Sequence, residues 1–191
     1  SALIGSAIVN AAKKTGMPDG VFSLLHGSGR VVGQGLVKHP KIKAAGFTGS
    51  QKAGRLLYDI ANQRVEPIPF FAEMGSVNPV LLLPSSLNND TVKMLAGSIT
   101  MGVGQFCTNP GLIISVDGND LKKFISELAD ELSKIESGVM LNQQICNSYN
   151  SEIENLIVHE EITLEGRAEK SKNLNSGRAI LSSVSGKSFI N

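Results

Sequence analysis

The chain has 191 residues, of which 41% are hydrophobic and 18% are charged, and its formal net charge is +1. This composition is typical of a packed globular protein and argues against a disordered one. The balanced charge argues against a nucleic-acid-binding surface, and no apolar run reaches the length of a membrane span. We therefore expect neither nucleic acid nor a membrane as a partner.

Cysteine and histidine usage indicates no disulfide framework and no metal site. The two cysteines, Cys107 and Cys146, are isolated, which fits a reducing compartment, so we expect a cytoplasmic protein. Cys146 lies in a helical pattern and is expected to be a buried structural thiol. The three histidines lie far apart and lack a Cys-x-x-Cys partner: His26, His39 and His159.

The first part of the chain alternates between helical patterns and short apolar runs. Apolar residues recur at helical spacing over 3–15, and Gly16 is expected to end this helix. The later segments are a strand at 21–25, a helix at 30–38, a strand at 43–47, a helix at 50–63 and a strand at 67–71. This alternation predicts a parallel sheet covered by helices on both faces. Because the chain enters on a helix, we expect earlier strands of the sheet to be missing.

The second part predicts further helices and strands. They are a strand at 79–83, a helix at 90–104, a strand at 112–116, a helix at 119–135, a helix within 142–159 and a strand at 179–184. Asn89 or Asp90 is expected to cap the helix that begins at 90. The pattern weakens after residue 160.

Two glycine-containing turns are candidate ligand sites. In Gly46-Phe47-Thr48-Gly49-Ser50 a predicted strand runs into a helix, whose free N–H groups and positive dipole end suit a phosphate. Gly49 permits close approach of the backbone, and the Ser50 hydroxyl can donate a hydrogen bond. The local pattern alone favours an ordinary N-cap. The cluster that contains Gly27, Gly29 and Gly33 misses the dinucleotide fingerprint by one position, and by itself predicts only a tight strand-to-helix turn.

A thiol and a carboxylate supply candidate chemistry. Cys107 follows a helical pattern among small and polar residues, where backbone N–H groups could bind an oxyanion and the thiolate could hold a covalent intermediate. Its alternative role is that of a buried structural cysteine. Glu73 directly follows an apolar strand, which predicts a desolvated carboxylate with a pKa raised toward that of a useful base. Its alternative role is a strand-end carboxylate in water, which is how we interpret the nearby Glu66.

Three segments together resemble the aldehyde dehydrogenase superfamily. They are the turn at 46–50, the segment Glu73-Met74-Gly75 followed by Asn78-Pro79, and the segment Gly104-Gln105-Phe106-Cys107. They match, in order, the family's pyrophosphate-contacting turn, its Glu-Leu-Gly-Gly-x-Asn-Pro block and its Gly-Gln-x-Cys block. The longer segments 66–79 and 106–111 resemble the subgroup that oxidises 2-oxoglutarate semialdehyde (2,5-dioxopentanoate).

The resemblance implies a fold and a reaction. The fold is α/β: residues 1–75 would be the C-terminal part of a Rossmann-like dinucleotide-binding domain, and 76–191 the first part of an α/β catalytic domain. Cys107 would add to the aldehyde, hydride would pass to NAD or NADP, and Glu73 would activate the water that releases the acid. The residues implied to bind the cofactor are Gly27, Gly29, Gly33, Thr48, Gly49, Ser50, Gly54 and Met74.

The sequence also departs from the family. Ser76 and Val77 replace the usual Gly-Lys, and the family's oxyanion Asn, its ribose-contacting Lys and its Glu-x-Phe-Gly-Pro block have no counterpart in the 191 residues. We therefore expect an incomplete central fragment of an enzyme whose full-length relatives form homo-oligomers. A truncated parallel sheet exposes apolar surface, so we expect the isolated chain to be marginally stable or aggregation-prone.

Three other functions stay open at this point. The first is a catalytically inactive remnant or interaction piece of the same family. The second is a cysteine hydrolase that uses Cys107 with one of the three histidines, although no Cys/His motif supports it. The third is a CoA-dependent acyl-transferring relative, because Glu73 alone does not exclude thiolysis.

Overall fold

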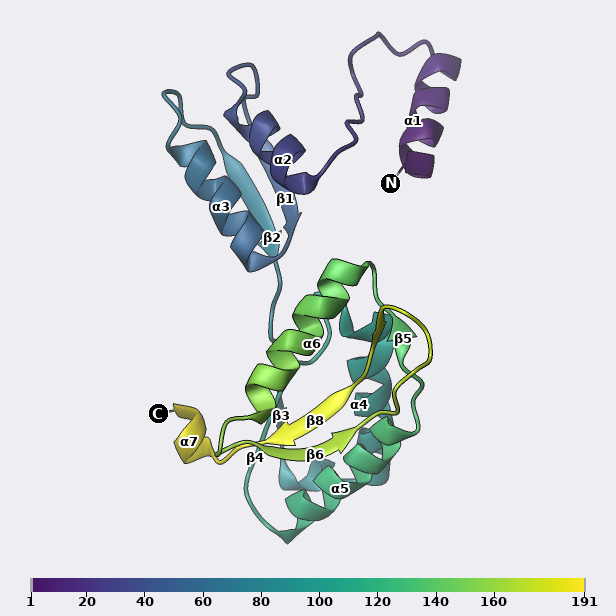
Figure 1. The fold of residues 1–191 in the computed structure, drawn as a ribbon, viewed down its shortest axis with the longest axis vertical. Helices are drawn as coiled ribbons and strands as arrows, with labels where there is room; N and C mark the ends of the chain where they lie inside the picture. The colour runs from purple at the N-terminus through teal and green to yellow at the C-terminus, as the bar shows by residue number, and fades with distance from the viewer. Residues whose placement is uncertain (1, 191) are drawn as a thin grey trace. The chain divides into compact units, whose positions relative to one another are not determined.

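A computed structural model describes residues 2–190, which form two compact units that divide between Gly75 and Ser76. Each unit combines helices with a pair of parallel strands, and this confirms the predicted α/β class (Figure 1). Among the described residues, no helix is long and apolar enough to cross a membrane.

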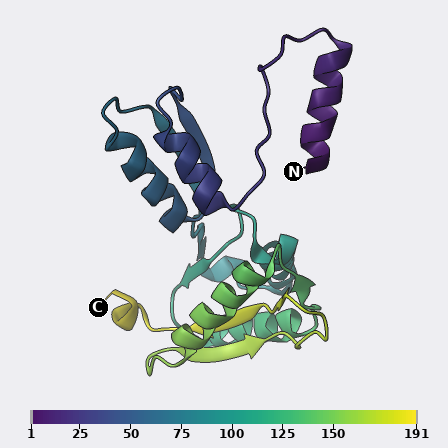
Figure 2. The same cartoon turned by 45° about the horizontal axis from the view of Figure 1, so that its top comes forward.

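The first unit is built around two parallel strands. Its elements are α1 (Ala2–Lys14), α2 (Gly29–Lys38), β1 (Ala45–Gly49), α3 (Gln51–Asn62) and β2 (Phe70–Met74). β1 pairs with β2, α3 packs on both strands, and α2 and α3 lie side by side (Figure 2). The buried core side chains come from both helices and from the segment before β2: Val37, Leu57, Ala61 and Ile68.

One expectation for the first unit is corrected. The segment 21–25 is not a strand, because β1 pairs only with β2 in the described sheet and the backbone of 21–25 has no strand partner. The helix over 3–15 is present and ends before Gly16, whose φ is +68°. However, the apolar face of this helix is largely uncovered within the described residues: Leu3 is 87% exposed and Ile4 is 67% exposed.

The second unit contains one parallel strand pair and two antiparallel pairs. Its elements are β3 (Pro79–Leu82), η1 (Pro84–Ser86), α4 (Asn89–Thr100), η2 (Met101–Gly104), β4 (Leu112–Ser115), α5 (Asn119–Ser133), β5 (Gly138–Val139), α6 (Gln143–Ile157), β6 (Thr163–Arg167), β7 (Ser176–Gly177), β8 (Ile180–Ser183) and α7 (Gly186–Ile190). β3 pairs with β4 in parallel, whereas β5 pairs with β7 and β6 with β8 in antiparallel fashion.

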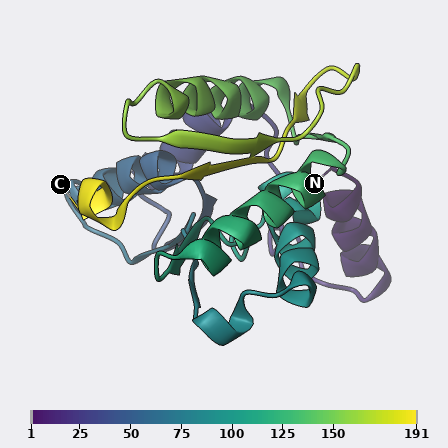
Figure 3. The ribbon, with the colours of Figure 1, turned by 90° about the horizontal axis from the view of Figure 1, so that it is seen from below.

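The core of the second unit lies between β3 and two long helices. Its buried side chains come from β3, α4 and α5: Leu82, Val92, Leu95, Ala96, Phe124, Leu128 and Leu132. The β6–β8 ribbon lies between α5 and α6 (Figure 3). β6 was not predicted, because Thr163–Arg167 is mostly polar and gains its strand geometry from pairing with β8.

Helix α6 is tied to this ribbon region by polar contacts. The Tyr149 hydroxyl donates to the carbonyl oxygen of Arg178 at 2.6 Å, and Arg167 Nη2 lies 2.9 Å from Glu154 Oε1. Burial raises the pKa of the Tyr149 phenol above its usual value, against the opposing influence of the two nearby guanidinium groups.

Helix α4 also differs from expectation at both ends. The N-cap is Asn88, whose side chain accepts from the Thr91 N–H, and not Asn89 or Asp90. The helix ends at Thr100 and does not continue to 104, because the residues that follow it adopt left-handed backbone angles. This early end is the starting point of the loop that carries Cys107.

Candidate active site

The carboxyl ends of β1 and β2 bring two predicted blocks together. In the parallel register, Thr48 pairs with Glu73 and Gly49 pairs with Met74. Ligands of open α/β sheets bind outside the carboxyl ends of the strands. Four of the predicted site residues therefore share the edge of the sheet at which a ligand would be expected.

The N-terminus of α3 lies directly beyond this edge. Ser50 is its N-cap, and its Oγ accepts from the Ala53 N–H at 3.3 Å, so the hydroxyl serves its own helix. Within residues 2–190, the backbone N–H groups of Gln51 and Lys52 donate no hydrogen bond. Two free donors at the positive end of a helix dipole suit a phosphate.

The other glycine cluster forms the start of α2. Ser28 caps this helix by accepting from the Val31 N–H. No atom lies within 4 Å of a Cβ built at Gly29, whereas a Cβ at Gly33 would reach 3.9 Å from Leu57 of α3. Gly33 therefore faces the neighbouring helix and Gly29 faces open space. The predicted turn leads into a helix, but it does not follow a strand.

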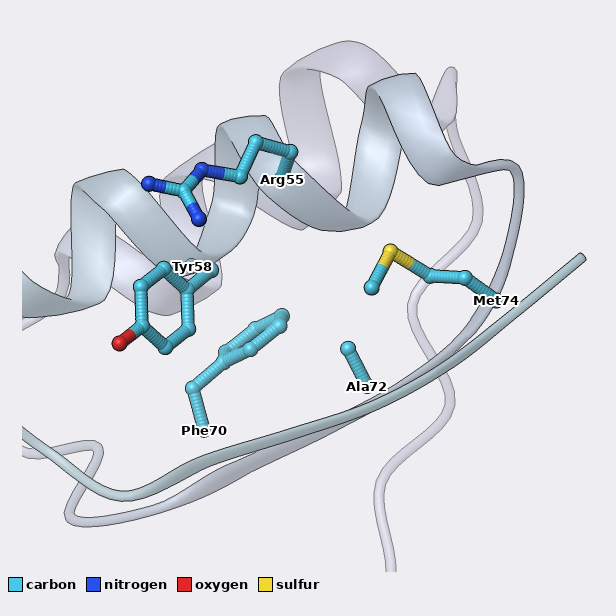
Figure 4. A pocket seen from close by; sticks show the side chains of 5 residues that line it. All are labelled: Arg55, Tyr58, Phe70, Ala72 and Met74. Atoms are coloured by element: carbon cyan, nitrogen blue, oxygen red, sulfur yellow. The ribbon is translucent and has the colours of Figure 1, made fainter. Parts of the chain in front are cut away.

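Met74 and Gly54 pack against each other beside an open pocket. A Cβ on Gly54 would lie 2.7 Å from the Met74 sulfur, so glycine is required for this approach. The pocket measures about 270 Å³ and is lined by side chains of α3 and β2: Arg55, Tyr58, Phe70, Ala72 and Met74 (Figure 4). Tyr58 meets Phe70 edge to face, and the Arg55 guanidinium lies 5.1 Å from the Tyr58 ring centre. The side chain of Met74 is thus occupied with packing on α3.

The desolvation predicted for Glu73 is not found. Its side chain is exposed at the end of β2. Glu66 is exposed as interpreted from the sequence, and its hydrogen bond and charge interaction with Lys43 lower its pKa. The strand pattern placed Glu73 correctly beside β1, but it could not predict exposure, which depends on what packs over the strand end.

Cys107 lies at the second position of a hydrogen-bonded turn in the other unit. The N–H of Asn109 donates to the carbonyl oxygen of Phe106 at 3.1 Å, which closes the turn around Cys107 and Thr108. The Cys107 side chain is exposed. Among the described residues, the backbone N–H groups of Cys107 and Thr108 donate no hydrogen bond. The alternative of a buried structural cysteine is therefore wrong for Cys107, and two free N–H groups accompany its thiol.

The segment before β3 fixes the backbone of this turn. The carbonyl oxygen of Cys107 accepts from Ser76 Oγ and from Asn78 Nδ2, the latter at 2.7 Å. Asn78 Nδ2 also lies 2.9 Å from the carbonyl oxygen of Asn109. Asn78 itself has a φ of +48°, a region that asparagine tolerates better than most residues. The Asn-Pro segment and the cysteine segment, recognised separately in the sequence, are in direct contact.

Three consecutive left-handed residues precede the turn. Gly102, Val103 and Gly104 have φ values of +59°, +60° and +69°. This conformation is unusual for a β-branched residue. One Val103 methyl group lies against Gly138 of β5, where an added Cβ would collide with it, and the other lies beside Gly177 of β7, where a Cβ would be 3.4 Å away. The glycine pair thereby permits the strained path of the chain that leads to Cys107.

Neither the second thiol nor the histidine of the second unit is hydrogen-bonded to Cys107 within the described residues. Cys146 is buried, as predicted, and its Sγ lies 3.6 Å from the carbonyl oxygen of Ser176. His159 is the histidine of the second unit, and no hydrogen bond joins it to Cys107. The described residues contain no group of three His, Cys, Asp or Glu side chains placed to hold a metal ion.

Comparison with known families decides the ancestry of this arrangement. The sequence model described as "Aldehyde dehydrogenase family" matches residues 1–177. The chain belongs to the aldehyde dehydrogenase family. This membership confirms the resemblance inferred from the three sequence segments, and it disfavours the cysteine hydrolase alternative.

Two similar curated relatives are named for one aldehyde. Alpha-ketoglutaric semialdehyde dehydrogenase 2 of Azospirillum brasilense is 52% identical over 154 residues, which cover 79% of this chain and 29% of the relative. Alpha-ketoglutaric semialdehyde dehydrogenase of Acinetobacter baylyi is 44% identical over 158 residues, which cover 81% of this chain and 30% of the relative. The chain thus spans less than a third of the length of these aldehyde dehydrogenases.

Solved structures agree on the fold. The chain resembles glyceraldehyde-3-phosphate dehydrogenase GapN of Methanocaldococcus jannaschii, complexed with NADP, with a TM-score of 0.73 and 25% identity over 92% of this chain and 40% of that chain. Proline utilization A of Bdellovibrio bacteriovorus gives a TM-score of 0.78 at 19% identity, covering 94% of this chain and 20% of that one. The backbone path of an aldehyde dehydrogenase is therefore present over nearly all of the chain.

Proposed function

We propose that this chain carries the thiol nucleophile and the general base of an NAD(P)-dependent aldehyde dehydrogenase acting on 2-oxoglutarate semialdehyde. The observation that carries the proposal is the exposed thiol of Cys107 in a backbone turn with two free N–H groups. The substrate is taken from the two relatives that are named for it, at 52% and 44% identity.

The residues at the end of β1 and β2 fit a dinucleotide. The free N–H groups of Gln51 and Lys52 would hold a phosphate group, and Gly49 presents no side chain at the strand end. Thr48, Ser50, Gly54 and Met74 surround this edge, with Gly27, Gly29 and Gly33 on or before α2. When bound, the nicotinamide ring of NAD or NADP would accept a hydride from the substrate carbon.

Cys107 performs the covalent step in this proposal. Its thiolate adds to the aldehyde carbon, and the free N–H groups of the turn donate to the oxygen on which negative charge develops. Loss of hydride from that carbon restores the carbonyl group and leaves a thioester on the Cys107 sulfur. The hydrogen bonds from Ser76 and Asn78 to the Cys107 carbonyl keep the backbone still during these changes.

Glu73 completes the cycle as the base. It takes a proton from water, the resulting hydroxide attacks the thioester carbon, and the thiolate leaves, which yields the carboxylic acid. Glu73 stands three residues before Ser76 in the sequence, and the Ser76 hydroxyl contacts the Cys107 carbonyl. Its exposure supports a role that needs access to water.

The test is turnover by protein expressed from its complete reading frame, followed by the absorbance of the reduced nicotinamide with 2-oxoglutarate semialdehyde as substrate. Cys107→Ala is expected to abolish both the first turnover and the steady state. Glu73→Gln is expected to keep the first turnover and lose the steady state, because the thioester then accumulates.

Two matched variants serve as controls. Cys146→Ser changes the buried thiol, and Glu66→Gln changes an exposed carboxylate that lies just before β2. Both are expected to retain turnover. Full activity of Cys107→Ala would refute the proposal. A well-folded wild-type protein with no turnover would instead support the catalytically inactive alternative, and acceleration by CoA in place of water would support the acyl-transferring one.

A further inference from the structure

The side chain of Asn109 connects the cysteine turn to the end of α4. Its Nδ2 lies within hydrogen-bond distance of three backbone carbonyl oxygens at the C-terminal end of this helix. They belong to Ser98 at 2.6 Å, Ile99 at 3.1 Å and Met101 at 3.2 Å. The last carbonyls of a helix have no intrahelical partner, so this amide group satisfies acceptors that the early end of α4 leaves open.

The same side chain closes the turn from its other side. Asn109 Oδ1 accepts from the N–H of Phe106 at 3.0 Å, while the backbone N–H of Asn109 donates to the carbonyl oxygen of Phe106 at 3.1 Å. Both polar groups of the Phe106 backbone are therefore bonded to Asn109. Cys107 is the next residue, and its own carbonyl is held from the segment before β3 by Ser76 and Asn78.

Only a side chain with both a donor and an acceptor can make this set of bonds. Aspartate would keep the acceptor for the Phe106 N–H but would place a negative charge against the helix carbonyls. Alanine would lose both the donor and the acceptor of the side chain. The position is half-buried, which leaves little room for water to replace the lost hydrogen bonds. The side-chain amide of asparagine supplies both the donor and the acceptor that these contacts require.

We propose that Asn109 is a positioning residue for the Cys107 thiol. It holds the turn at a fixed angle to the C-terminal end of α4, so that the sulfur faces the carbon it attacks. The inference rests on the proposed role of Cys107 as the nucleophile. It adds that the alignment of the thiol, and not its availability, depends on an amide two residues further along the chain. The contacts that support this role are those of the Asn109 amide with the end of α4 and with the Phe106 N–H.

The test compares Asn109→Ala and Asn109→Asp with a matched control, Asn88→Ala, in protein expressed from its complete reading frame. Asn88 caps the opposite end of the same helix, so its loss destabilises α4 without touching the turn. Three quantities are measured for each variant: the rate of the first turnover, the KM for the aldehyde and the rate at which iodoacetamide labels Cys107, read by peptide mass spectrometry.

Both Asn109 variants are expected to slow the first turnover by about tenfold or more, since misplacement of a reacting group reduces the rate without removing the group. The KM and the labelling rate are expected to change by less than about threefold, because the thiol stays exposed. Asn88→Ala is expected to lower the melting temperature and leave the first turnover unchanged.

Two results would overturn the inference. The first is a first turnover at the wild-type rate in the Asn109 variants. The second is an equal loss of rate in Asn88→Ala, because lower stability of α4 would then explain the slower turnover. Asn109→Asp keeps the acceptor for the turn and supplies a folded variant if Asn109→Ala does not fold. Failure of the proposed function is recognised separately, because it would appear as turnover that survives Cys107→Ala.

Discussion

Replacement of Asn78 tests how the cysteine turn is held. Its Nδ2 donates to the carbonyl oxygens of Cys107 and Asn109 at 2.7 and 2.9 Å, and its φ is +48°. Asn78→Ala removes both hydrogen bonds and leaves the left-handed backbone to alanine, which tolerates this region less well than asparagine. Asn78→Gly removes the same bonds without the backbone penalty.

The expected magnitudes follow from these two contributions. Each hydrogen bond contributes about 1 kcal/mol to the free energy of unfolding, and alanine at positive φ costs about 1 kcal/mol more. We therefore expect Asn78→Ala to destabilise the second unit by about 3 kcal/mol, and Asn78→Gly by about 2 kcal/mol.

The assay is urea unfolding of the second unit. The chain contains two tyrosines and no tryptophan, so in a Tyr58→Phe background the fluorescence reports on Tyr149 of α6. A lower midpoint at an unchanged slope measures the loss of stability. Equal midpoints for the alanine and glycine variants would refute the backbone argument, and an alanine variant as stable as the parent would refute the hydrogen-bond argument.

Three further predictions concern other parts of the chain. Gly138→Ala should destabilise the second unit by about 1–3 kcal/mol in the same urea assay, because a Cβ there would collide with Val103. The control is Gly118→Ala, which should destabilise the unit far less, because a Cβ at Gly118 would have no atom within 4 Å. Ser50→Ala should lower the stability of the first unit by about 1 kcal/mol through loss of the α3 cap, with Ser50→Asp restoring it in thermal melts followed by circular dichroism. Burial raises the pKa of Tyr149, so the folded state holds this proton longer than the unfolded state and its stability should fall as the pH rises above 10. Tyr149→Phe should flatten that alkaline decline, and a decline identical to that of the parent would show that another group causes it.

Local sequence patterns predicted most of the regular elements. Helical periodicity and capping residues placed α1, α2, α3 and α5 within a few residues of their observed bounds, because these signals act between residues three or four positions apart. The order of the three family segments also identified the ancestry, and the helical neighbours of Cys146 predicted its burial.

Tertiary structure decided the features that depend on distant partners. A run such as 21–25 has the composition of a strand but becomes one only where another strand accepts its hydrogen bonds, and the polar segment of β6 becomes one because β8 does. The exposure of Glu73 likewise depends on what covers the end of β2, which no local pattern describes.

The contacts around Cys107 show the same division most clearly. The sequence indicated a thiol among small polar residues, but Asn78 reaches the turn from 29 positions away and Asn109 reaches back 11 positions to the end of α4. A side-chain amide can bond to any carbonyl that folding brings within about 3 Å. Residue type therefore set which bonds these asparagines could form, and the packed path of the chain set which bonds they do form.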